Sequence, residues 1–220
     1  MKTKFTHIKI CCISSIKEAE IAIKAGATAI GLVGNMPSGP GVISDDLIAK
    51  ITANIPGHID TFLLTSETSV DKIIEHHSKV NTKTIQIVDI LTEGTHVHLK
   101  QALPTVKIVQ VLHVLDEKTI EEALVISKNV DVILLDSGNP NLGTKELGGT
   151  GRVHNWEISK KIIELVQIPV FLAGGINALN AQKAIDEVNP YGLDLCSGVR
   201  TNGNLDVIKL NAFFKAINTN

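Results

Sequence analysis

The chain alternates eight short runs of apolar, mostly β-branched residues with segments whose apolar residues recur at helical spacing. The strand-like runs cover residues 5–11, 27–33, 59–65, 84–88, 106–114, 130–136, 169–174 and 193–198. The helical segments cover 16–26, 45–55, 69–80, 117–128, 156–166, 180–188 and 205–217, and a weaker one covers 95–103. Eight strand-then-helix units in 220 residues predict a single-domain α/β protein, a closed (β/α)8 TIM barrel over residues 1–220. A doubly wound open sheet is the rival, but it rarely needs eight such regular units.

Composition excludes several classes of function. The formal net charge is -2, with no basic run, so nucleic acid is not an expected partner. No run of about 18 apolar residues occurs, so we expect no membrane contact and a cytoplasmic location. Three cysteines, two of them adjacent and none in a CxxC pair, fit neither a disulfide framework nor a zinc site. The histidines likewise show no metal-ligand pattern.

A barrel places its chemistry at the C-terminal ends of the strands and in the loops that follow. The candidates at these ends are Cys11, Asp136, Gly174 with Gly175, and Ser197 with Gly198. The longest irregular stretch, 137–155, is glycine-rich and follows the sixth strand, where a functional loop is expected.

The adjacent cysteines raise the question of which thiol is chemically active. Alternation along a strand puts Lys9 and Cys11 on one face and Cys12 on the other. Lys9 inside the barrel needs a counter-charge, which Asp194 on the closing strand can supply. We therefore expect Cys11 at the inner rim and Cys12 behind the strand as an ordinary buried cysteine. A thiolate at Cys11 can accept a proton if positive charge nearby lowers its pKa.

Five motifs in fixed order carry a family resemblance. They are KICCIS, LLDS, GGTGRVHNW, LAGGIN and LDLCSGVR. Together they make the chain resemble the phosphoribosylanthranilate isomerases of tryptophan biosynthesis over nearly its whole length. The resemblance implies that Cys11 is the general base and that Asp136 is the general acid. It also implies that Gly174, Gly175, Ser197 and Gly198 bind the substrate phosphate.

The chemistry of that reaction suits these residues. An Amadori rearrangement of an aminoaldose needs an acid to open the sugar ring and a base to remove the C2 proton. A cysteine and an aspartate on separate strands can supply both, so no cofactor and no metal are expected. Glycines let the backbone approach a phosphate closely, although glycine pairs also occur in ordinary turns and Asp136 could equally cap a helix.

The chain departs from the family pattern at the other end of the substrate. The family carries an arginine after the second strand that binds the anthranilate carboxylate, whereas residues 35–44 contain no basic residue. Cys12 stands where the family has glycine, and Arg200 where it has glutamate. Gln86 of the family motif on the fourth strand remains. Arg152 and Arg200 are the candidates to replace the lost contact, with surface ion pairing as the alternative for both.

Three functions remain open from the sequence. The first is a phosphoribosylanthranilate isomerase-like aldose-ketose isomerase that acts on a small phosphorylated sugar. The second is a paralogue that isomerises a different phosphosugar amine, and the third is a non-catalytic phosphosugar-binding barrel. Retention of Cys11 and Asp136 argues against the third, while the missing arginine separates the first two. The oligomeric state is not predicted.

Overall fold

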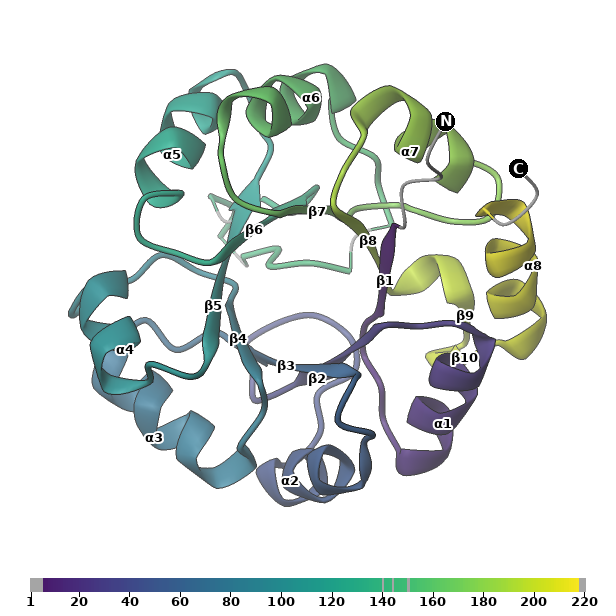
Figure 1. Cartoon of the computed structure of the whole chain (residues 1–220), viewed down its shortest axis with the longest axis horizontal. Helices are drawn as coiled ribbons and strands as arrows, with labels where there is room; N and C mark the ends of the chain where they lie inside the picture. Colours follow the sequence, from purple (N-terminus) through teal and green to yellow (C-terminus); the bar gives the residue numbers. More distant parts are fainter. Residues whose placement is uncertain (1–5, 140, 144, 150, 218–220) are drawn as a thin grey trace.

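A computed structural model describes residues 6–217 except 140, 144 and 150, and it is a closed eight-stranded parallel barrel surrounded by helices (Figure 1). The strands are β1 His7–Ile10, β2 Ala29–Val33, β3 Asp60–Thr65, β4 Thr84–Ile87, β5 Lys107–His113, β6 Val132–Asp136, β7 Val170–Leu172 and β8 Gly192–Leu195. The helices are α1 Ile16–Ala25, α2 Asp45–Asn54, α3 Val70–Val80, α4 His96–Ala102, α5 Lys118–Ile126, α6 Trp156–Leu165, α7 Ala181–Val188 and α8 Val207–Ile217. The predicted fold class is confirmed, and the predicted domain's ends, 1–5 and 218–220, lie outside the described residues.

The barrel closes where β1 pairs with β8, in a register that sets Lys9 opposite Asp194. Several strands are shorter than their sequence runs, because apolar residues continue past the last ladder hydrogen bond into the rim. The predicted strand 5–11 ends at Ile10, and its residue 5 lies outside the described residues. After β8 come a short 3-10 turn, η1 Ser197–Val199, and a two-stranded ribbon, β9 Arg200–Thr201 with β10 Asn204–Leu205.

Side-chain caps fix where several helices begin. The side chains of Ser15, Ser44, Thr95 and Asn155 each accept a hydrogen bond from the first turn of α1, α2, α4 and α6. A cap of this kind contributes about 1 kcal/mol to helix stability. The cap at Thr95 starts the weakly patterned helix α4, which the structure confirms.

Apolar packing divides into a layer between strands and helices and a smaller layer inside the barrel. Inside, Lys9 is fully buried, with its Nζ 2.9 Å from Asp194 Oδ2 and 5.1 Å from the centroid of the Phe62 ring. The predicted ion pair is thereby confirmed. Removing one partner of such a buried pair typically costs about 3–5 kcal/mol. The ion pair between Lys9 and Asp194 is therefore a fixed part of the barrel interior beneath the rim.

The described part of the segment between β6 and α6, residues 137–155 without 140, 144 and 150, lies over the C-terminal mouth of the barrel (Figure 1). Within its described part, Asn139 bridges Glu146 in antiparallel fashion, and Lys145 forms an ion pair with Asp89. Ser38 Oγ donates a 2.5 Å hydrogen bond to the carbonyl oxygen of Lys145, so the loop is joined to the segment after β2. This is the loop in which function was expected.

Candidate active site

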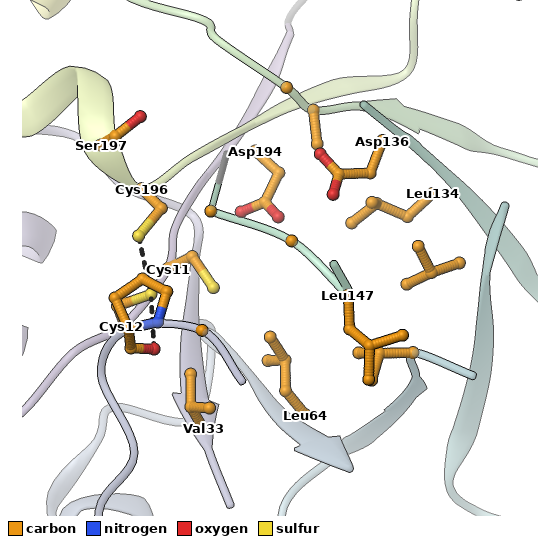
Figure 2. A pocket seen from close by; sticks show the side chains of 18 of the residues that line it. Cys11, Cys12, Val33, Leu64, Leu134, Asp136, Leu147, Asp194, Cys196 and Ser197 are labelled. Atoms are coloured by element: carbon orange, nitrogen blue, oxygen red, sulfur yellow. Dashed lines mark hydrogen bonds between the residues drawn. The ribbon is translucent and has the colours of Figure 1, made fainter. Parts of the chain in front are cut away.

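A cavity opens at the C-terminal mouth, lined by the strand ends and by the described part of the 137–155 loop (Figure 2). Its described lining comes from the ends of all eight strands and the loops after them. It comprises Cys11, Cys12, Val33, Met36, Ser38, Gly39, Pro40, Leu64, Gln86, Val88, Val111, Leu134, Asp136, Leu147, Gly148, Gly149, Gly151, Ala173, Gly174, Gly175, Ile176, Asp194, Cys196 and Ser197. Six of the nine residues predicted as site residues line this one cavity.

Cys11 lies at the rim just past β1 and is 5% exposed. Its main-chain N–H donates a 2.7 Å hydrogen bond to the carbonyl oxygen of Leu195, which anchors it to β8. A hydrogen bond from the Cys12 side chain, aided by the Lys9 ammonium and opposed by burial, lowers the pKa of the Cys11 thiol. Lowering this pKa raises the thiolate fraction at neutral pH, as a general base requires.

Asp136 ends β6 and points into the same cavity (Figure 2). Burial raises the pKa of its carboxyl group, against the opposing effect of main-chain hydrogen bonds at Ser137 and Gly138. A raised pKa increases the protonated fraction, and a protonated carboxyl group can donate a proton as an acid. The two groups therefore have their pKa values moved toward each other, in the directions that a base and an acid need.

Two further buried oxygens belong to this cavity. Within the described part of the chain, Gln86 Oε1 and Asp194 Oδ1 are buried and have no hydrogen-bond partner. Gln86 was predicted as a substrate contact, while Asp194 was predicted only as the partner of Lys9. A buried oxygen without a partner is costly, so both atoms suit donors that a ligand would bring. The alternation that put Asp194 inside the barrel was the signal for its second role.

The structure corrects the predicted position of Cys12. It does not lie behind the strand, because β1 ends at Ile10 and the alternation of side chains stops there. Cys12 instead takes a left-handed backbone conformation, φ 63°, and lines the cavity. Its Sγ lies 2.7 Å from Cys196 Sγ and 3.6 Å from the carbonyl oxygen of Pro40 (Figure 2).

Cys12 also packs closely against the segment after β2. Gly41 lies in the segment that has lost its arginine, and its φ is +81°. A Cβ on Gly41 would lie 2.5 Å from Cys12 Cβ, a separation that real Cβ atoms do not show. Cys12 thus occupies the space into which a side chain at position 41 would extend.

The predicted phosphate loops meet on one side of the cavity. Gly174, Gly175 and Ser197 line it, and a Cβ on Gly175 would lie 2.9 Å from the Gly151 carbonyl oxygen. Gly198 does not line it, since it packs against the loop after β7, where a Cβ would lie 2.0 Å from the carbonyl oxygen of Ile176. Glycine at 198 is thus required for the loops after β7 and β8 to touch.

The two arginines are not where substrate contact was expected. Arg200 is 7% exposed and turns away from the cavity, with its NH2 group 3.1 Å from Glu18 Oε2 and 2.5 Å from the Cys12 carbonyl oxygen. Arg152 is exposed and forms an ion pair with Glu146. Neither lines the cavity. Arg200 pairs instead with Glu18 on α1, whose side chain is 13% exposed and which the sequence does not distinguish from an ordinary acidic residue at a helix start.

The rest of the cavity is apolar. The residues that contribute are Val33, Met36, Leu64, Val88, Val111, Leu134 and Leu147. Leu147, 5% exposed, reaches in from the covering loop, and Figure 2 shows it in the same cavity as Leu64 and Leu134. Among the residues that the structure describes, none that lines the cavity is lysine, arginine or histidine. Among the described residues, no group of three histidine, cysteine or acidic side chains could hold a metal ion. No described helix is long and apolar enough to span a membrane.

A (β/α)8 barrel with a paired thiol and carboxyl group at its C-terminal mouth defines an enzyme of the acid–base class. Residues 8–216 match the family model described as N-(5′phosphoribosyl)anthranilate (PRA) isomerase. The chain belongs to this family and is an intramolecular isomerase of the PRA isomerase type, as the motifs predicted.

Two curated relatives are close over nearly the full length. The N-(5′-phosphoribosyl)anthranilate isomerase of Methanosarcina acetivorans is 33% identical, over 96% of this chain and 93% of that protein. Isomerase 2 of Methanosarcina mazei is 34% identical, over 96% of this chain and 97% of that protein. The matched lengths agree, so the resemblance concerns a whole relative and not a fragment.

Solved structures agree with the fold. The PRA isomerase of Pyrococcus furiosus has 25% identity and a TM-score of 0.79, covering 97% of this chain and 98% of that chain. A thiamine phosphate pyrophosphorylase from the same organism, at 21% identity, has a TM-score of 0.65 and covers 97% of this chain and 96% of that one. Barrel shape alone therefore does not select the activity, and the family assignment rests on the sequence.

Proposed function

We propose that this chain catalyses the Amadori rearrangement of N-(5′-phosphoribosyl)anthranilate, the substrate named for its relatives, with Cys11 as base and Asp136 as acid. The observation that carries the proposal is that both side chains enter one cavity, from opposite parts of the barrel. The relatives supply the identity of the substrate, and the cavity supplies the roles of the residues.

The reaction follows from the two protonation states. Protonated Asp136 gives its proton to the ring oxygen of the sugar, the ring opens, and an iminium ion forms at C1. The thiolate of Cys11 then removes the C2 proton, and the enolamine that results tautomerises to the aminoketose. Burial of Asp136 and the Lys9 ammonium near Cys11 favour the states that these steps require.

The substrate phosphate would bind beside Gly174, Gly175 and Ser197. Glycine allows main-chain amides to approach an anion at close range. The lack of a lining cation among the described residues means that these amides would carry the attraction. The anthranilate ring would then extend to the apolar side, against Leu64, Leu134 and Leu147.

One observation favours a different substrate. Among the described residues, none that lines the ring end of the cavity is lysine, arginine or histidine. A carboxylate that loses a charged hydrogen bond loses about 1.5–3 kcal/mol of interaction. The paralogue hypothesis predicts that a phosphoribosyl arylamine without the carboxylate is isomerised as well as the anthranilate. Carboxylate recognition by other means predicts at least a tenfold preference for the anthranilate.

The test is turnover of purified protein with phosphoribosylanthranilate, followed by loss of the substrate's fluorescence. Activity of the unchanged chain, lost in Cys11→Ser and in Asp136→Asn at equal folded fraction, is the expected result. A folded chain that converts neither the anthranilate nor the arylamine without carboxylate would show that it is not a catalyst of this reaction. Full activity in Cys11→Ser would remove that residue from the role of base.

A further inference from the structure

We propose that Cys12 and Cys196 form a redox-active dithiol at the mouth of the active site. A small disulfide of the glutathione type would oxidise it to an intramolecular bridge that lowers isomerase activity. The thiol chemistry stands independently of the proposed function, and its effect on turnover rests on that function.

The two sulfur atoms are already close. Cys12 Sγ and Cys196 Sγ are 2.7 Å apart, only about 0.7 Å more than a disulfide bond of about 2.05 Å (Figure 2). The residues follow the ends of β1 and β8, which pair up to Ile10 and Leu195. Neighbouring strands lie about 4.8 Å apart, which falls within the Cα separations of about 4.4–6.8 Å that disulfides span.

The backbone is held in the conformation that brings the sulfurs together. Cys12 has φ 63°, a region that costs a residue with a Cβ roughly 1 kcal/mol or more and that glycine enters freely. Arg200 donates to the carbonyl oxygens of Cys11 and Cys12 and is itself paired with Glu18. These hydrogen bonds stabilise the left-handed conformation of Cys12. In this conformation the Cys12 thiol faces the Cys196 thiol in the cavity.

The exposure of the two thiols fixes the order of events. Cys196 is half-buried on the cavity wall, whereas Cys12 is 5% exposed. Hydrogen bonds with the neighbouring thiols, together with burial, raise the pKa of Cys12 well above its ordinary value. Cys196 is therefore the group that meets a disulfide from solution, and Cys12 is the group that resolves the product.

The exchange balances with one glutathione disulfide per chain. The thiolate of Cys196 attacks one glutathione sulfur, a mixed disulfide forms, and one glutathione thiolate leaves. Cys12, as thiolate, attacks the Cys196 sulfur and releases the second glutathione thiolate. The two protons from the protein thiols pass to the two glutathione thiolates, so the protein loses two electrons and glutathione disulfide gains them.

Closing the bridge changes the base and its surroundings. Cys12 no longer has a thiol proton to donate to Cys11, so the pKa of Cys11 rises and its thiolate fraction falls. The backbone at Cys12 and Cys196 must also move, and these residues adjoin Cys11 and Ser197. A misplacement of about 1 Å in an active site can cost about 100-fold in rate, so we expect a loss between tenfold and that value.

The test counts thiols in protein equilibrated with excess oxidised glutathione. We expect two of the three cysteine thiols to disappear, with no glutathione mass retained and with full recovery on addition of a dithiol reductant. A chain that keeps all three thiols, or keeps glutathione on Cys196 without closing, would overturn the proposal.

Two variants identify the pair. Cys12→Gly removes one thiol and relieves the positive φ, and Cys196→Ser changes one atom of the other. Both should fail to form a bridge, and a bridge in Cys196→Ser would assign it to Cys11 and Cys12 and refute the proposed pair. Each protein is compared with itself before and after oxidation, and only the unchanged chain should lose turnover reversibly.

Measuring turnover distinguishes the proposed dithiol control from the proposed isomerase function. A bridge that forms without any change in turnover would overturn the control of activity by the dithiol. Reduced protein without turnover would instead contradict the proposed function, while the thiol count would still decide whether the bridge exists.

Discussion

Replacing Arg200 by alanine should destabilise the fold far more than it affects the chemistry. The guanidinium group is 7% exposed and donates to Glu18, to the carbonyl oxygens of Cys11 and Cys12, and to that of Gly203 at 2.9 Å. Removing it leaves a carboxylate, 13% exposed, without its cation. Breaking a buried ion pair on one side costs about 3–5 kcal/mol, a large fraction of the 5–15 kcal/mol that typically holds a domain folded.

The pH dependence of this loss gives a second measure. Burial alone would raise the pKa of Glu18, but Arg200 and the main-chain donors of Leu205 and Ser14 hold it below its ordinary value. A depressed carboxyl pKa contributes stability that is present above the unfolded pKa and is lost as the pH falls. The difference between the wild type and Arg200→Ala should therefore shrink as the pH falls from the ordinary glutamate pKa of about 4.3 through the lowered pKa of Glu18 in the wild type.

Urea unfolding of the two proteins measures the difference, and the chain supplies its own control. Arg152 is the only other arginine, and its ion pair with Glu146 is exposed. Arg152→Ala should change stability by about 0–1 kcal/mol. If Arg200→Ala unfolds at the wild-type urea concentration while the KM for substrate rises, Arg200 binds the ligand and the structural role is refuted.

Three further outcomes follow from the site and its supports. The rate of turnover should depend on pH in a bell-shaped profile. Its inflection at high pH, set by Cys11, should lie below the pKa of an ordinary thiol, because the pKa of Cys11 is lowered. The acidic limb, set by Asp136, should lie above the pKa of an ordinary aspartate, because burial raises its pKa, and limbs at the ordinary values would contradict both shifts. Gly198→Ala should raise the KM for a phosphorylated substrate at least tenfold, because its Cβ would lie 2.0 Å from a main-chain oxygen, whereas Gly57→Ala, in open space, should not. Burial lowers the pKa of His154 from 6.5 to about 4, so the free energy of unfolding should decrease by about 3 kcal/mol as the pH is lowered from 6.5 to 4. A His154→Gln variant that shows the same decrease would assign it to other groups.

The sequence predicted the barrel because each of its eight strands is mostly buried and reads as a short, largely apolar run followed by a helical pattern. The same regularity placed Lys9 opposite Asp194 and brought Cys11 and Asp136 to the same mouth. These successes concern residues on regular strands or, for Cys11, the residue directly after one, where a period of two still decides the face. They needed no knowledge of the loops.

The errors begin where the regular strand ends. Cys12 lies beyond Ile10, so alternation no longer fixes its direction, and its left-handed conformation depends on contacts from Arg200. Arg200 was misplaced for a related reason, since its partner Glu18 is distant in sequence and its hydrogen bonds go to main-chain oxygens. Leu147 covers the cavity from a loop whose path depends on Ser38 and Asp89, and no local pattern encodes such a path.

The contact between Cys12 and Gly41 constrains how this chain can change by mutation. Because a Cβ at position 41 would lie 2.5 Å from Cys12 Cβ, no side chain fits at 41 while cysteine stands at 12. The residues at positions 12 and 41 therefore cannot be varied independently. A Cβ at 41 would also lie 3.0 Å from the Cα of Cys12, and φ at 41 is +81°, so a side chain at 41 stays strained even with glycine at 12 unless the backbone moves.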